Sequence, residues 1–154
     1  MSIISDAIQE KCLAFSDRII KLNDYLLAQA AMEHEKYKKE LRQRKPGQKT
    51  SSILHLPSSI PLHLQAVSNL CNQLLRSGTS VGANNAEASS AISKADFKSK
   101  SYIALKEARE SMYWLELLHR NNYLTDIQFN SLYADAEELV KVLTHRCKKL
   151  DGVE

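Results

Sequence analysis

A glutamate and a histidine stand three residues apart at Glu116 and His119, in the stretch Glu-Leu-Leu-His. Four-helix bundles that hold two iron ions use two such Glu-x-x-His motifs together with two further glutamates on facing helices. None of the other histidines in the chain follows a glutamate at this spacing. The ligands for such a centre are therefore too few, and we expect no metal and no cofactor.

His119 is instead expected to be a partly buried histidine with a local hydrogen bond. The spacing of nucleophiles and bases along the chain does not place a Ser-His-Asp or Cys-His arrangement. The sequence therefore predicts a protein that is not an enzyme.

Two of the four glycines, Gly78 and Gly82, lie one helical turn apart in the stretch RSGTSVGANNAEASS. A glycine inside a helix costs about 0.8 to 1 kcal/mol relative to alanine, so this pair needs a packing or functional reason. A phosphate-binding loop would need a preceding strand and a Gly-Lys-Ser/Thr ending, and the stretch has neither. We predict that Gly78 and Gly82, with Ala86 and Ser89 beside them, form a row of small residues against which another helix packs closely.

The composition favours helices and a single domain. The chain has 154 residues, with only 4 glycines and 3 prolines, and its formal net charge is +3. These values predict one all-α domain spanning residues 1–154. Cys12, Cys71 and Cys147 lack a Cys-x-x-Cys pairing and are expected to be buried thiols. Because no apolar run is long enough to cross a membrane and the N-terminus lacks a signal-peptide pattern, we expect a cytoplasmic protein without a membrane partner.

Apolar residues at helical spacing predict a first helix near the N-terminus. Its core stripe consists of Ile4, Ile8, Phe15, Ile19, Leu22 and Leu26. Beyond Ala31 the apolar phase thins until Pro46 and Gly47, so this end of the helix should project from the core. Residues 48–59 are rich in serine, and the region from about 33 to 60 is predicted to be a basic helix extension followed by a linker.

A second helix is predicted to begin near Pro61, because the fixed backbone angle of proline suits a first turn. The expected residues of its apolar side are Ile60, Leu64, Val67, Cys71, Leu74, Val81, Ala88 and Ile92. Ser93 and Asp96 resemble a capping box that opens a third helix, which is expected to run to about Asn121. Its core residues are expected to be Phe97, Ala104, Ala108, Ser111, Leu115 and Leu118.

A further capping box, at Thr125 and Gln128, predicts the start of a fourth helix. The expected core residues of this helix are Phe129, Leu132, Ala136, Leu139, Leu143 and Leu150. The third helix also has a second apolar flank, made by Ile103, Trp114 and Leu117. A helix of a small monomeric bundle has little use for two apolar sides, so these three residues predict an oligomer interface.

The stretch LLRSGTSVGANNAEASSAISKADFKSKSYIALKEARESMYWLELLHRNNYLTD, of which Leu74 to Thr125 is the specific part, resembles a bacterial four-helix-bundle family. That family was first noticed as reading frames in intervening sequences of large-subunit ribosomal RNA genes, and it is also labelled a ribosomal protein family. The resemblance extends over residues 74–150. It implies an up-down-up-down four-helix bundle that assembles as a ring-like homopentamer and has no established catalytic activity.

The sequence departs from the family pattern in two places. Residues 33–63 form an insertion where members have a short link, and Asn85 stands where members commonly have isoleucine. By helical phase Asn85 falls on the apolar side of the second helix. A buried amide without partners costs about 1 to 3 kcal/mol, so we expect a cross-helix hydrogen bond or a bound water there.

A polar stripe occupies the other side of the second helix. Its members are Gln73, Arg76, Ser80, Asn84 and Glu87. They fall within an arc of about 80° on a helix. All but Gln73 match the family signature, so the stripe is interpreted as a subunit contact or a ligand-facing wall, with a plain solvated face as the alternative.

Basic residues gather after the first helix leaves the core. They are Lys36, Lys38, Lys39, Arg42, Arg44, Lys45 and Lys49. Repeated around an oligomer, such a patch can hold RNA or DNA, whereas a solvated arm that keeps the protein soluble is the simpler interpretation. The sequence thus predicts a homo-oligomeric binding or scaffolding protein, with a nucleic-acid-binding protein as the alternative.

Overall fold

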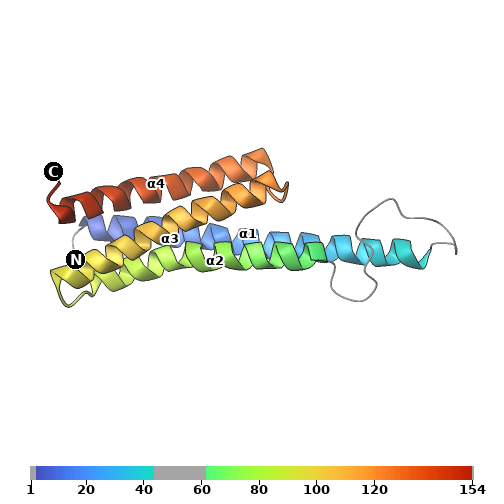
Figure 1. Cartoon of the computed structure of the whole chain (residues 1–154), viewed down its shortest axis with the longest axis horizontal. Coiled ribbons are helices and arrows are strands. Elements are labelled where there is room, and N and C mark those ends of the chain that lie inside the picture. The colour runs from blue at the N-terminus through green and yellow to red at the C-terminus, as the bar shows by residue number, and fades with distance from the viewer. Residues whose placement is uncertain (1–2, 44–61, 154) are drawn as a thin grey trace.

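The computed structural model describes residues 3–43 and 62–153, and within these ranges it contains four helices and no strand (Figure 1). The helices are α1 (Ile3–Arg42), α2 (Leu62–Ser89), α3 (Lys94–Arg120) and α4 (Asp126–Asp151). The all-α prediction is confirmed. The expectations for Pro46, Gly47, the linker at 48–59 and the basic residues Arg44, Lys45 and Lys49 lie outside the described residues.

Helices that follow one another in the chain pack side by side, and α4 also lies against α1, where the contact is least extensive. The four helices run nearly parallel or antiparallel to one another and surround one core (Figure 1). Its largest fully buried apolar side chains come from three helices: Phe15, Ile19, Leu115, Leu118, Leu139 and Leu143. All six were expected in the core from helical spacing, because a stripe of apolar side chains has to be buried against the other helices.

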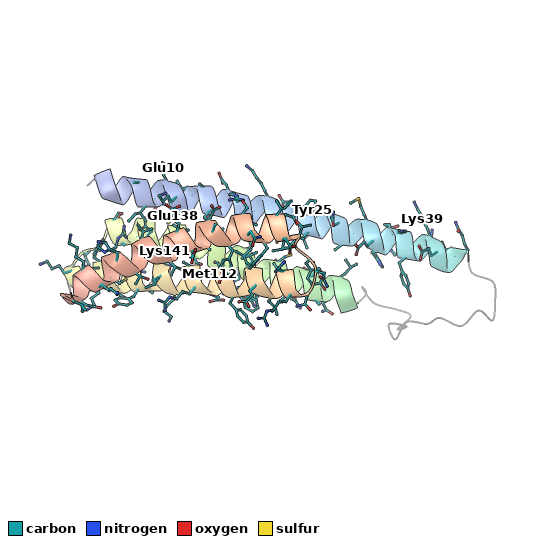
Figure 2. All side chains as sticks on the ribbon, turned by 90° about the horizontal axis from the view of Figure 1, so that it is seen from above. Glu10, Tyr25, Lys39, Met112, Glu138 and Lys141 are labelled. Carbon is teal, nitrogen blue, oxygen red and sulfur yellow. The ribbon has the colours of Figure 1, made fainter. Side chains whose placement is uncertain are left out.

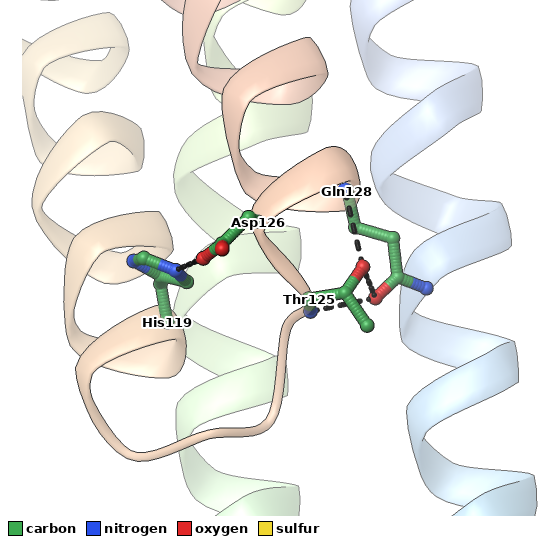
Figure 3. Close-up of polar contacts among 4 residues, drawn as sticks. All are labelled: His119, Thr125, Asp126 and Gln128. Atoms are coloured by element: carbon green, nitrogen blue, oxygen red, sulfur yellow. Dashed lines mark hydrogen bonds and ion pairs between the residues drawn. The ribbon is translucent and has the colours of Figure 1, made fainter.

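Capping residues define the starts of α3 and α4. Ser93 is the N-cap of α3 and its side chain accepts a hydrogen bond from the backbone nitrogen of Asp96 at 3.1 Å. The return bond runs to the Asp96 carboxylate from the nitrogen of Ile92, one residue before the cap. At α4 the reciprocal capping box between Thr125 and Gln128 is complete, as predicted (Figure 3).

One predicted core residue is wrong. Ile92 was expected on the apolar side of the second helix, but α2 ends at Ser89 and the Ile92 side chain is 96% exposed. The chain turns toward α3 just after this end, so the helical phase that pointed to Ile92 no longer applies. Ala86 and Ser89 are also exposed, and the buried row of small residues is reduced to Gly78 and Gly82.

Helix α1 continues beyond the bundle. Its last turns extend past the start of α2, and Lys39 lies on this projecting end (Figures 1 and 2). Ala30 is the last buried residue of α1 among those whose side chains the structure describes. Beyond Ala30 the described side chains of α1 are exposed or half-buried, and the described part of the arm ends at Gln43.

Candidate functional site

Helices α1 and α2 approach each other closely at the two glycines. A Cβ atom added at Gly78 would lie 3.1 Å from Cγ1 of Ile19, and one added at Gly82 would lie 3.4 Å from Cβ of Cys12. The Ser16 hydroxyl donates to the carbonyl oxygen of Gly78 at 3.3 Å. The glycines thus bring the backbone of α2 within reach of α1 side chains.

Asn85 lies one turn further along α2, and its side chain is fully buried. Its amide nitrogen donates to Oε1 of Gln9 on α1 at 2.6 Å, and its amide oxygen accepts from Nη1 of Arg146 on α4 at 2.7 Å. The expected cross-helix hydrogen bond is therefore confirmed, and one amide ties three helices together. We call Gln9, Asn85 and Arg146 the polar triad.

Arg146 completes the polar triad from α4. Its guanidinium carbon lies 5.7 Å from the centre of the Phe97 ring of α3, a cation–π arrangement. Burial lowers the pKa of Arg146, because the charged form loses hydration. Burial also raises the pKa of the Cys12 thiol to about 11, only partly offset by Arg146, so this thiol stays protonated and unreactive at neutral pH.

The polar stripe of α2 borders α3. Gln73, Ser80 and Asn84 are half-buried, whereas Arg76 and Glu87 are exposed. Asn84 donates to the carbonyl oxygen of Ser80 at 2.9 Å, and Glu87 forms a salt bridge with Lys100 of α3. The stripe is thus continuous with the neighbouring surface of α3.

The apolar flank of α3 lies beside this stripe. Ile103, Trp114 and Leu117 are half-buried, and Tyr113 next to them is 57% exposed. The Trp114 indole nitrogen donates to Glu110 at 3.0 Å. Underneath, the Ser111 hydroxyl donates to that of Ser77 at 3.0 Å and joins the two helices. We call the polar stripe and this flank together the α2–α3 face.

Glu107 carries a carboxyl group at the junction of the two helices. Burial raises its pKa, Glu110 raises it further, and Lys106 and Arg76 oppose the shift. A partly desolvated carboxyl group beside exposed cations and an aromatic cluster is suited to polar contacts with another molecule. Neither Glu107 nor Tyr113 was singled out from the sequence, although both lie within one turn of residues that were.

The described part of the basic arm carries exposed cations at Lys36, Lys38, Lys39 and Arg42. Glu33, Glu35 and Glu40 lie on the same stretch, and Lys38 pairs with Glu35 at 2.9 Å. Side chains of Lys36 and Lys39 border a shallow hollow with Met32, which is 64% exposed. Residues 33–42 of the arm thus carry charges of both signs, and positive charges exceed negative ones only slightly.

His119 connects the end of α3 to the start of α4. Its Nε2 lies 2.8 Å from Oδ1 of Asp126 (Figure 3), and its ring stacks on Phe129 with the centres 4.2 Å apart. The prediction of a partly buried histidine with a local hydrogen bond is confirmed. Among the described residues there is no group of three or more histidine, cysteine, aspartate or glutamate side chains that could hold a metal ion.

A model of the 23S rRNA-intervening sequence protein family matches residues 48–145, which include the α2–α3 face. The chain belongs to this family. The resemblance carried by the stretch from Leu74 to Thr125 is thereby confirmed. No curated protein matches the chain. In the part of this family member that the structure describes, no helix is long and apolar enough to span a membrane.

Among solved structures, this member of the intervening-sequence family is similar to a protein of unknown function from the S23 ribosomal protein family of Bacteroides thetaiotaomicron. The two are 34% identical, and the match covers 92% of this chain and 98% of the other with a TM-score of 0.65. The likeness therefore extends over nearly the whole of both chains.

Sequence reasoning missed the partners of Asn85. Arg146 lies three residues after Leu143, at the edge of the apolar side of α4. A charged side chain at such a position usually has a buried partner, which here is the amide oxygen of Asn85. Gln9 gives no comparable signal, because a glutamine at the edge of a helical stripe is equally compatible with solvent.

Proposed function

We propose that the protein is a non-enzymatic scaffold that associates with copies of itself through the α2–α3 face. The observation that carries the proposal is the partial exposure of Ile103, Trp114 and Leu117 beside Tyr113, which is 57% exposed. Aromatic residues surrounded by polar groups are enriched at the centres of protein interfaces. The family resemblance supports a ring of five copies, and we adopt that stoichiometry.

Size-exclusion chromatography with light scattering tests this proposal. At micromolar concentration we expect a mass several times the 17.4 kDa of one chain, and we expect Leu117→Lys to reduce it toward that of one chain. Ile127→Lys is the matched control, because Ile127 is 84% exposed and lies on α4, outside the face. A monomeric parent protein would contradict the proposal.

A second candidate function, binding of RNA or DNA, is favoured by the exposed Lys36, Lys38, Lys39 and Arg42 on the projecting end of α1. A single arm offers few phosphate contacts. An oligomer would present several arms to one polyanion, and each additional phosphate contact raises both the affinity and its dependence on salt.

Changing Lys38, Lys39, Arg42 and Arg44 to glutamine should weaken binding of RNA or DNA by about tenfold or more at low salt and flatten its salt dependence. Helicity and oligomer mass should stay nearly unchanged. Gel-shift titrations at two salt concentrations measure the effect. A variant with glutamine at Lys94, Lys141, Lys148 and Lys149 removes four exposed positive charges outside the arm and is the control. Equal binding by both variants would place any nucleic-acid surface away from the arm.

A further inference from the structure

Helix α1 carries a second heptad pattern on the side that faces away from the core. We call it the outer seam, and its members alternate between acidic and apolar residues at steps of three and four: Glu10, Leu13, Asp17, Ile20, Asp24 and Leu27. On a helix they fall within an arc of about 100°. Leu13 is 49% exposed and Ile20 is 42% exposed. Apolar residues repeated in this way are typical of a helix that packs against another helix.

Among the described residues, α2 and α4 leave Leu13 and Ile20 of the outer seam exposed and cover Leu27 only in part. The core-facing side of α1 contains Cys12, Phe15 and Ile19, all buried. The side toward α4 contains Lys11 and Arg18, which pair with Glu138 and Asp135. Figure 2 shows Glu10 on α1 and Glu138 on the adjacent α4. The side chains of α1 that pack into the core and those that pair with α4 are thus not residues of the seam.

The charges of the outer seam have no partner within the described part of the chain. Glu10, Asp17 and Asp24 are exposed, and no salt bridge or side-chain hydrogen bond joins them to a described residue. By contrast, Lys11 and Arg18 of α1 are paired with carboxylates of α4. Three like charges beside an exposed apolar row favour a partner surface that is apolar with positive groups around it.

The α2–α3 face has this character. Arg76 and Lys106 are exposed there, and among the described residues neither takes part in a salt bridge. They lie on either side of the half-buried apolar flank of Ile103, Trp114 and Leu117, Arg76 on α2 and Lys106 on α3. The carboxylate of Glu110, which lies among them, accepts the hydrogen bond of the Trp114 indole. The two unpaired cations of this face, Arg76 and Lys106, can thus pair with carboxylates of the seam.

We infer that the outer seam of α1 in one copy docks on the α2–α3 face of a second copy, an inference that rests on the self-association proposed above. The lengths agree: Glu10 to Leu27 spans about 26 Å of helix, and Ile103 to Leu117 spans about 21 Å. Because the two surfaces differ, the contact is head-to-tail, and each copy uses one surface toward each neighbour. Repetition of such a contact closes into a ring or continues as a filament.

A mixing experiment tests the pairing directly. One variant, Leu13→Glu with Ile20→Glu, blocks the seam; the other, Lys106→Glu with Leu117→Glu, blocks the face. All four side chains are exposed or half-buried, so the bundle should fold, which circular dichroism and thermal melting check. We expect each variant alone to have the mass of one chain. An equimolar mixture should give a dimer of one copy of each, because one intact seam and one intact face remain.

Charge reversal provides a second, independent measurement. Asp17→Lys with Asp24→Lys should weaken self-association by about tenfold or more, and so should Arg76→Glu with Lys106→Glu. Combining all four changes should restore the parental mass. If the parent protein is monomeric, the proposed self-association is wrong. If it is oligomeric but the seam variants keep its mass, or if the two blocked variants do not pair when mixed, only the docking of seam on face is overturned.

Discussion

Replacing Asn85 with leucine should lower the free energy of unfolding by about 2 to 4 kcal/mol, although leucine is apolar and of similar size. The position is fully buried, so a hydrophobic residue would ordinarily be favourable there. The change removes the acceptor of Arg146 at 2.7 Å and the donor to Gln9 at 2.6 Å. Leaving the half-buried guanidinium of Arg146 without its acceptor costs more free energy than the burial of the leucine side chain contributes.

Urea denaturation followed by circular dichroism measures this loss, and a double-mutant cycle separates its cause. Arg146→Met alone leaves the Asn85 amide oxygen unpaired and should also destabilise the fold. The double variant, Asn85→Leu with Arg146→Met, replaces both partners by apolar groups and should recover a large part of the stability. If Asn85→Leu by itself unfolds at or above the urea midpoint of the parent, the polar triad does not stabilise the bundle.

Leucine at Gly78 should destabilise the fold by about 1 to 3 kcal/mol or more, even though leucine has the better helix propensity. The new Cβ would lie 3.1 and 3.2 Å from the two γ carbons of Ile19, and the rest of the side chain would need space that Ile19 occupies. Ile19 is fully buried and has little room to move. The α1–α2 contact would therefore have to separate locally.

Alanine substitutions give the matched control for this effect. At Gly82 the nearest atom to a new Cβ is Cys12 Cβ at 3.4 Å, an ordinary van der Waals contact. Gly82→Ala should thus be neutral or stabilise by about 0.5 to 1 kcal/mol through helix propensity. Thermal melts of Gly78→Leu, Gly82→Leu and Gly82→Ala compare the three. Leucine variants as stable as the parent would show that the glycines do not line a close contact.

Local patterns along the chain were enough to predict the elements. The apolar stripes that include Phe15, Leu115 and Leu139 are buried as their spacing indicated, because each amphipathic helix has to place its apolar side against the others. The caps at Ser93 and Thr125 start α3 and α4 as predicted. A cap depends on residues three positions apart, so the sequence specifies it without reference to the rest of the fold.

The prediction that Ile92 is buried was wrong because it extended the apolar phase of α2 past the end of the helix. Its helical phase is correct, but a phase carries meaning only while the helix continues, and α2 ends at Ser89. The Ser93 cap that opens α3 follows Ile92 directly, so α2 has to end before this position and Ile92 lies in the connection between the two helices.

The sequence by itself determined the helices, their buried sides and the family, because periodicity, caps and a specific stretch are all properties of neighbouring residues. Only the tertiary structure decided which side chains meet across helices. Asn85 is 76 residues from Gln9 and 61 residues from Arg146 along the chain. The hydrogen bonds between them depend on how the three helices are shifted along their axes relative to one another. The outer seam likewise became visible only when the structure left Leu13 and Ile20 uncovered, since the same spacing on the core side is buried. Helical spacing identifies a side of a helix, but the packing of the other helices decides whether water or protein covers it.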